Sequence, residues 1–369
     1  MLQKFLFLFF TFFCATFISN CTGKNSSNPN NYGATSGTAS DYSNEDYVMF
    51  SSSEPLESEE LTAIKKFMKF YPDLEFTAEY DDEVSDWKVS ITKKLFLNRP
   101  EKSESEKLLT RKADFYWAGG RLLPKSELSK KDDYWILQYH YDNVLRDPKT
   151  YTEEEIERIK DFASSKNRKK DNGTPMFFFD FIYSAKSRPI IEEHIIKTKF
   201  LGKTTKVHER ILPALKRVEA EICMAAGISV EDLSSAERIA KIDVSSEKQA
   251  HALILTDEQK EIRKFIKSLR SSDAYYWREI AGTNRKSFHS YGIAVDLLPN
   301  RLNGRSIYWG WEKERSGDKW MMVPPEARWA PPEAVIKIFE EHGFIWGGYW
   351  VIFDNMHFEY HPELISSTK

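Results

Sequence analysis

The sequence predicts an α+β fold, and three observations support this class. Apolar residues recur at helical spacing in segments such as 59–70 and 255–268. Apolar and polar residues alternate, as in half-buried strands, at 293–296 and 356–360. The last elements of the chain follow the order helix, strand, turn, strand. The 369 residues are enough for two modest domains or one large one.

The N-terminus is predicted to be a targeting segment. Lys4 provides a positive charge ahead of a largely apolar run at 5–18. This is the pattern of a signal peptide, and the run is shorter than the roughly 20 residues that span a bilayer. We therefore expect residues 1–20 to be a signal peptide that is removed from the mature chain.

Cys21 ends the stretch F-I-S-N-C and is followed by small and polar residues. This arrangement resembles the lipobox of bacterial lipoproteins, and it is closest to the looser lipoboxes of spirochaetes, because Ile18 and Asn20 depart from the usual residues. The resemblance implies an exported protein with lipid on Cys21, anchored to a bacterial membrane at its periplasmic or cell-envelope face. Cleavage as an ordinary secreted protein is the alternative.

Residues 21–56 are predicted to form a lipid-anchored flexible tether. They are rich in Ser, Asn, Thr, Gly and acidic residues, and they hold too few apolar residues for a core. Cys14 lies in the segment that would be removed and Cys21 would carry lipid. Only Cys223 then remains, so no intramolecular disulfide is expected in the mature chain.

The charge balance excludes one large class of partners. The net charge is −3 and the pI is about 6.3. This gives no electrostatic basis for binding nucleic acid, which calls for a basic surface. We therefore expect no nucleic-acid partner.

Residues 57–188 are predicted to form an N-terminal accessory α+β region. A helix is expected at 59–70, one or two strands at 87–97, a helix at 151–162 that begins with T-E-E-E, and a strand at 175–183. The region is rich in aromatic residues. We expect them to form a packed core, and a groove for glycan or peptide is the alternative.

Residues 189–369 are predicted to form a second region. Helices are expected at 207–226 and 255–268. Another helix begins after Pro332 and ends at Gly343, with proline near the first turn and glycine at the end.

The stretch S-F-H-S-Y-G-I-A-V-D at 287–296 is the centre of the functional argument. His289 and Asp296 lie seven residues apart, with Gly292 between them, where the backbone is expected to need a positive φ or a close approach. On the predicted strand the small Ala294 shares the face of Asp296 and leaves room for an ion. A histidine nitrogen and a carboxylate oxygen are two of the three protein ligands of a catalytic zinc.

The stretch F-D-N-M-H-F-E-Y at 353–360 offers the third ligand. It contains His357, with Asp354 and Glu359 on either side. His289, Asp296 and His357 are therefore the predicted Zn²⁺ ligands, with a spare carboxylate to act on a bound water. A hydrogen-bonded network of the three side chains without metal is the alternative.

The pattern S-x-H-x-x-G-x-A-x-D followed by a late (D/E)-x-x-H resembles the VanX/VanY-type zinc D-alanyl-D-alanine carboxypeptidases and related peptidoglycan endopeptidases. These enzymes belong to the LAS metallopeptidases, which share their fold with the hedgehog signalling domain. The resemblance covers residues 189–369. It implies a zinc peptidase domain with a small antiparallel sheet and flanking helices, acting on peptidoglycan stem peptides.

By this resemblance Asp354 is the general base. Residues three apart on a straight strand face opposite sides, so this role requires a turn or bulge between Asn355 and Met356. Glu359 shares the face of His357. It is the alternative base, or a partner that fixes the imidazole.

The resemblance also implies an arginine that binds the substrate or its developing oxyanion. Arg278 is the first candidate for this catalytic role, and a salt bridge that holds the loop is the alternative. Ser287, Arg285 and Trp309 are predicted to contact substrate, with Trp309 in the wall of the cleft; core packing is the alternative for Trp309.

Three functions follow from these features. The first is a zinc D-alanyl-D-alanine carboxypeptidase. The second is an L,D-endopeptidase of the cell wall, because D-x-x-H-F-E also resembles endolysin-type members. The third is a wall-binding lipoprotein that uses the zinc fold as a non-catalytic scaffold.

Overall fold

The structure is a computed structural model that describes residues 49–51, 59–93, 112–139, 146–234 and 255–365. These residues belong to a compact unit that spans 44–369. The predicted signal peptide at 1–20, Cys21 and most of the predicted tether lie outside the described residues. Among the described residues, no helix has both the length and the apolar character needed to cross a membrane.

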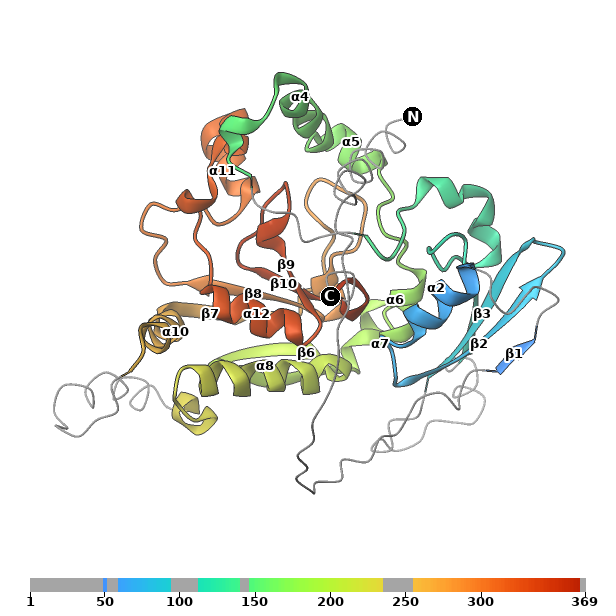
Figure 1. The fold of residues 1–369 in the computed structure, drawn as a ribbon, viewed down its shortest axis with the longest axis horizontal. Coiled ribbons are helices and arrows are strands. Elements are labelled where there is room, and N and C mark those ends of the chain that lie inside the picture. Colours follow the sequence, from blue (N-terminus) through green and yellow to red (C-terminus); the bar gives the residue numbers. More distant parts are fainter. Residues whose placement is uncertain (1–48, 52–58, 94–111, 140–145, 235–254, 366–369) are drawn as a thin grey trace, which may run out of the picture. The chain divides into compact units, whose positions relative to one another are not determined.

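A four-stranded sheet organises the N-terminal region (Figure 1). Its strands follow one another in the order β1-β2-β3-β4, with β1 parallel to β2 and the other neighbours antiparallel. Helix α2 buries its apolar stripe in the same core cluster as the inner face of β3. The bounds are β1 (Met49–Ser51), α2 (Glu59–Met68), β2 (Leu74–Asp81), β3 (Asp86–Lys93) and β4 (Lys112–Tyr116). The helix expected at 59–70 is confirmed, and three residues of the predicted tether form β1.

Short helices follow this sheet. Helix α4 (Glu153–Phe162) begins at Thr152, whose side chain forms a capping box with Glu155, as the T-E-E-E pattern predicts. Helix α5 spans Ser165–Lys170. The strand predicted at 175–183 is wrong, because helix α6 (Phe177–Ile182) occupies that position. A short apolar run does not by itself distinguish a buried strand from a buried helix.

A second four-stranded sheet organises the C-terminal region, with the order β7-β8-β10-β9 and antiparallel neighbours throughout. Helices α8, α10 and α12 lie along it, and the β5–β6 hairpin lies beside β7 (Figure 1). The predicted small antiparallel sheet with flanking helices is therefore confirmed. The elements are α7 (Arg188–Glu192), β5 (Ile195–Phe200), β6 (Lys203–His208), α8 (Leu212–Ala225), α10 (Asp257–Ser268), β7 (Leu269–Asp273), β8 (Ala294–Pro299), α11 (Trp309–Ser316), α12 (Glu333–Glu341), β9 (Phe344–Trp346), β10 (His357–Tyr360) and α13 (Pro362–Ile365).

Short segments of 3-10 helix connect many of these elements. They are η2 (Lys125–Asp133), η3 (Pro148–Thr150), η4 (Glu209–Ile211), η5 (Val230–Ser234), η6 (Phe288–Tyr291), η7 (Gly317–Met322), η8 (Pro325–Ala327) and η9 (Gly347–Tyr349). Of these, η6 carries a predicted metal ligand.

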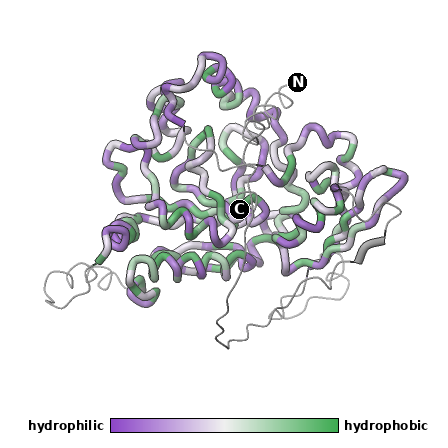
Figure 2. Tube along the Cα trace, in the orientation of Figure 1, coloured by the Kyte–Doolittle hydropathy of each residue, from purple (hydrophilic) through white to green (hydrophobic). Residues whose placement is uncertain are grey.

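The main core draws residues from both predicted regions. Ile64 and Phe178 from the first region belong to the same buried cluster as Leu215, Phe339 and Phe358 from the second. Along α8 the chain alternates between hydrophobic and hydrophilic residues, as expected for a helix with one buried face (Figure 2). The apolar stripe predicted within 207–226 is therefore present.

Candidate metal centre and cleft

Two neighbouring strands bring the two sequence motifs together. Asp296 on β8 and His357 on β10 are direct partners in the antiparallel pair. Directly opposed residues place their side chains on the same face of a sheet. Accordingly, Nδ1 of His357 lies 2.7 Å from Oδ1 of Asp296.

His289 reaches the same point from η6, which begins after Ser287. The Ser287 hydroxyl caps this turn by accepting a hydrogen bond from the backbone N–H of His289. Nε2 of His289 lies 3.2 Å from Oδ2 of Asp296 and 3.2 Å from Nδ1 of His357. Ser287 is buried and caps the turn, and it does not line the cleft beside the cluster, which differs from its predicted role in contacting substrate.

Gly292 ends η6 in the left-handed conformation, with φ of 66°. A Cβ there would lie 2.7 Å from Cδ1 of Ile195 and 2.8 Å from the backbone nitrogen of His208. The position therefore requires glycine for both its φ and its close approach, as the sequence predicts.

Replacing Gly292 with alanine is expected to lower the free energy of unfolding by about 3 kcal/mol or more, because backbone strain and overpacking add. Urea denaturation measures the loss. Gly304→Ala is the matched control: Gly304 has φ of 79° and open space around its Cβ position, so only the strain of about 1–2 kcal/mol applies. Equal losses in the two variants would contradict the close-approach argument.

The three predicted ligands form a group that could hold a metal ion. One donor atom from each of His289, Asp296 and His357 lies within 4.8 Å of the others. The remaining imidazole nitrogens are engaged elsewhere. Nδ1 of His289 donates to the carbonyl oxygen of Ala274 at 2.5 Å, and Nε2 of His357 donates to Oε1 of Glu359 at 2.8 Å. These contacts turn Nε2 of His289 and Nδ1 of His357 toward Asp296, as expected of histidine ligands.

Charges within the cluster oppose the effect of burial. Burial raises the pKa of a carboxyl group, but the positive charge of His289 and hydrogen bonds from both histidines hold the pKa of Asp296 well below its usual range. Burial lowers the pKa of His357, yet its hydrogen bonds to Asp296 and Glu359 raise it well above the usual range. The three side chains therefore interact as a strongly charged unit, in which the two histidines are buried and Asp296 is half-buried at the cleft.

Asp354 lies next to these three side chains. The chain turns at Asn355 and Met356 before β10 begins, so the turn that the role of Asp354 requires is present. Its Oδ1 atom is buried and has no hydrogen-bond partner among the described residues. Burial raises the pKa of Asp354 to about 8, with His357 and Arg278 opposing the rise and Asp296 adding to it. A carboxylate whose pKa is raised by burial, and whose oxygen has no hydrogen-bond partner among the described residues, is suited to accept a proton.

A cleft with a volume of about 460 Å³ opens beside the cluster. His289, Asp296 and Arg278 line it, so the first candidate arginine lies in the same cleft as two of the predicted ligands. Arg285 does not line this cleft. Its guanidinium packs over Gly173 and lies 3.8 Å from Asp171. The other lining residues are Thr204, Thr205, Lys206, Asp273, Ala274, Tyr275 and Tyr276.

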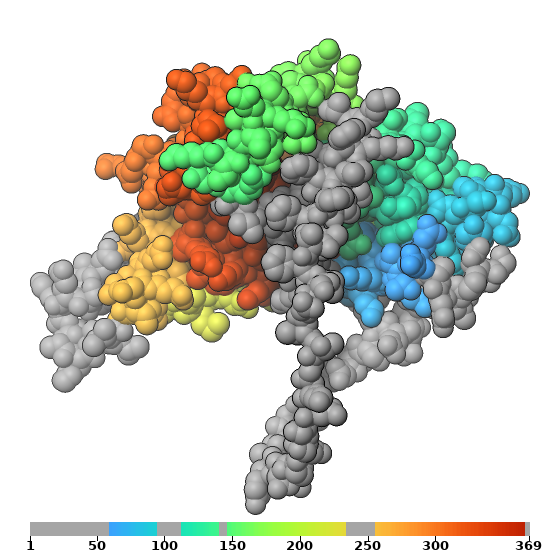
Figure 3. Space-filling model, turned by 45° about the horizontal axis from the view of Figure 1, so that its top comes forward, coloured from blue at the N-terminus to red at the C-terminus, as the bar shows by residue number. Residues whose placement is uncertain are grey.

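Trp309 lies in a small core cluster and is not among the residues that line this cleft, which is the core-packing alternative that the sequence left open. It is 6% exposed, and its ring centroid lies 5.2 Å from that of Trp320. The guanidinium of Arg168 covers the ring at 5.1 Å. Figure 3 shows the α4–α5 segment in green against the α11 segment in orange, which is the junction that this cluster fills.

Three further residues near the cluster were not singled out from the sequence. His361, Glu363 and Tyr71 are buried and form a connected set of contacts behind Glu359. The available signal was the alternation of His357, Glu359, His361 and Glu363, which places polar groups at every second position along β10 and on into α13.

The fold and the donor set together define a candidate metallohydrolase: an α+β domain with a His-Asp-His group at a cleft and a buried carboxylate beside it. Residues 281–360 match the family described as D-alanyl-D-alanine carboxypeptidase. The matched stretch contains all three donors, Asp354 and Glu359, and it supports a peptidase of this family in the C-terminal region. Searches of curated proteins and of solved structures found no match.

Proposed function

We propose that this protein is a zinc peptidase that hydrolyses peptidoglycan stem peptides, in its leading form as a D-alanyl-D-alanine carboxypeptidase. The observation that carries the proposal is the convergence of His289, Asp296 and His357 within the stretch that matches the carboxypeptidase family. Two imidazoles and one carboxylate are a donor set that zinc accepts in catalytic sites.

The residues around the donors fit this group. Ala274 and Glu359 fix the two imidazoles from behind, so each presents one nitrogen toward the same point as Asp296. When bound there, zinc supplies a Lewis acid that activates water near neutral pH. Asp354 would take a proton at its free Oδ1 and return it to the leaving nitrogen.

Arg278 would bind the negative charge of the substrate. It lines the cleft with His289 and Asp296, and its positive charge acts on Asp354. A guanidinium forms charge-assisted hydrogen bonds with a carboxylate or a developing oxyanion. The terminal carboxylate of a stem peptide, or the oxyanion formed from its scissile carbonyl, is the group that we expect it to hold.

Mass spectrometry of purified muropeptides tests the proposal. The compact unit 44–369 is incubated with zinc, and in parallel with a chelator. Chelator-sensitive loss of a terminal alanine is the expected result, because the donors need the metal to act. Cleavage inside the stem would instead establish the L,D-endopeptidase. Zinc binding without any product would favour the non-catalytic scaffold and contradict the proposed peptidase.

We also propose that the chain is exported and lipid-anchored through Cys21, on the basis of the sequence pattern alone. Replacing Cys21 with serine is expected to move the protein from the detergent phase to the aqueous phase in a phase-partition experiment on bacterial cells, because the lipid attachment atom is removed. Cys14→Ser is the matched control, since that residue would leave with the signal peptide. A Cys21→Ser protein that still partitions into detergent would contradict the anchor.

A further inference from the structure

A chain of buried polar side chains continues behind the metal centre. Nε2 of His357, which points away from Asp296, lies 2.8 Å from Oε1 of Glu359. The second oxygen of Glu359 lies 3.4 Å from Nε2 of His361, an ion-pair contact. All of these groups are buried, so water does not compete strongly for them.

His361 connects onward to the N-terminal region. Its Nδ1 lies 2.9 Å from Oε1 of Glu363, and the hydroxyl of Tyr71 donates to the other oxygen of Glu363 at 2.6 Å. Tyr71, His361 and Glu363 are each at most 2% exposed. We refer to Tyr71, Glu363, His361, Glu359 and His357 as the polar relay.

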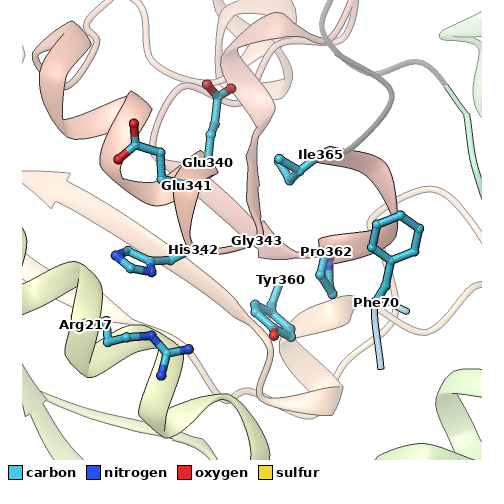
Figure 4. Close-up of a pocket in the computed structure, with 9 residues that line it drawn as sticks. All are labelled: Phe70, Arg217, Glu340, Glu341, His342, Gly343, Tyr360, Pro362 and Ile365. Carbon is cyan, nitrogen blue, oxygen red and sulfur yellow. The ribbon is translucent and has the colours of Figure 1, made fainter. Parts of the chain in front are cut away.

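The segment that carries Tyr71 contacts the end of β10 and the residues that follow it. Tyr71 enters the relay, while its neighbour Phe70 faces a separate surface pocket with Tyr360, Pro362 and Ile365 (Figure 4). None of the relay side chains lines that pocket. The contact between the two segments therefore has an apolar outer part and a polar inner part, and the inner part leads to the metal centre.

The charges of the relay depend on one another. Glu359 is buried and contacts His357 through one carboxylate oxygen and His361 through the other. Burial opposes protonation of His361, yet Glu363 and Glu359 raise its pKa to about 9. A buried charge that loses its partner is strongly destabilised. Each member of the relay thus constrains the position of the next.

We propose that Tyr71, Glu363 and His361 are positioning residues of the metal centre, which hold Glu359 in place and thereby keep Nδ1 of His357 directed at Asp296 and His289. Tyr71, His361 and Glu363 lie outside the stretch matched by the carboxypeptidase family. The N-terminal region, through Tyr71, is then part of what forms the metal site. This inference rests on the zinc site of the proposed function and is independent of which peptide bond is cut.

Tyr71→Phe in the full-length chain tests the relay, because it removes only the hydroxyl that bonds Glu363. Zinc affinity is measured by competition with a chromogenic chelator, and ligand geometry by the visible absorption of the cobalt-substituted protein. Zinc binding is expected to weaken about fivefold, the effect of one hydrogen bond. The cobalt bands are expected to shift. His361→Gln, closer to the metal, is expected to weaken zinc binding about 10-fold or more.

Tyr116→Phe is the matched control. The Tyr116 hydroxyl also donates to a carboxylate, Oδ2 of Asp81 at 2.7 Å, in a partly buried contact on the N-terminal sheet, away from the relay. The Tyr116→Phe variant is expected to lose stability, while its zinc affinity and its cobalt spectrum stay unchanged. The relay is overturned if Tyr71→Phe and His361→Gln both bind zinc as tightly as Tyr116→Phe. If Tyr71→Phe does not fold, His361→Gln decides. A parent chain that binds no zinc would overturn the zinc site itself, whereas a parent that binds zinc without cleaving peptides would refute only the proposed activity.

Discussion

Replacing Asp354 with asparagine is expected to lower kcat on muropeptides by about 10²–10⁴-fold, the usual contribution of a general base, while zinc stays bound. Asparagine keeps the shape of the side chain but cannot accept the proton. Because burial disfavours the charge of Asp354 and its Oδ1 has no partner among the described residues, the substitution is also expected to raise the free energy of unfolding of the metal-free protein. Single-turnover kinetics, zinc content and urea denaturation measure the three effects.

Glu359→Gln is the matched control, because Glu359 is the other carboxylate beside His357. It contacts Nε2 of His357, on the side of the ring that faces away from Asp296, so it is placed to orient the ligand and not to reach a water in the cleft. Zinc affinity is expected to fall about 10–100-fold, and excess zinc should restore activity. The activity of Asp354→Asn should not rise when excess zinc is added. The reverse pattern would assign the base to Glu359.

Local signals in the sequence predicted the elements whose ends depend on a few neighbouring residues. Thr152 caps α4 through Glu155, and α12 ends just before Gly343, which has φ of 86°. Gly292 has the positive φ that its place in the motif predicts. The cap at Thr152 and the stop at Gly343 depend on residues within one turn of the chain, where residue type alone constrains the backbone. The positive φ of Gly292 is equally local, whereas its close approach to Ile195 and His208 is not.

The composition of the metal site could be predicted, but its assembly could not be derived from spacing. Asp296 and His357 are partners across β8 and β10 although 61 residues separate them. The residue types suggested that the two motifs belong together, and the resemblance to a known family supported it, but no spacing in the sequence showed it. Alternation along a straight strand placed Asp354 on the side opposite His357. The turn before β10 corrects this, and it depends on tertiary contacts such as the hydrogen bond that the backbone N–H of Asp354 donates to the carbonyl oxygen of Gly347.

The incorrect strand at 175–183, and the contacts that the sequence did not reveal, involve residues whose partners lie far away in the sequence. Helix α6 is short and apolar, and its Asp180 accepts hydrogen bonds from Lys286 and Tyr291, more than 100 residues later. Trp309 is covered by Arg168, which no local pattern links to it. The Tyr71–Glu363 hydrogen bond spans 292 positions. Such contacts arise only when the two sheets share one core, so periodicity cannot reveal them.

Replacing His289 with alanine is expected to remove zinc from the site and activity with it. A three-ligand site that loses one donor should forfeit roughly a third of a binding free energy of about 10–16 kcal/mol, which weakens zinc binding by about 10²–10⁴-fold. His289 is the donor that no strand pairing supports: it comes from η6, positioned by Ser287, Gly292 and the carbonyl of Ala274. Zinc stoichiometry after dialysis and hydrolysis of muropeptides measure the loss.

The His208→Ala variant distinguishes the loss of a metal ligand from the loss of stability that follows when any buried imidazole is removed. His208 and His289 are each 3% exposed, but His208 bonds the carbonyl of Tyr183 and contributes no donor to the metal group. It is therefore expected to lose stability and keep full zinc stoichiometry. If His289→Ala retains zinc as well as His208→Ala does, the donor set is wrong, since Asp296 and His357 alone cannot provide the three protein ligands that a catalytic zinc requires.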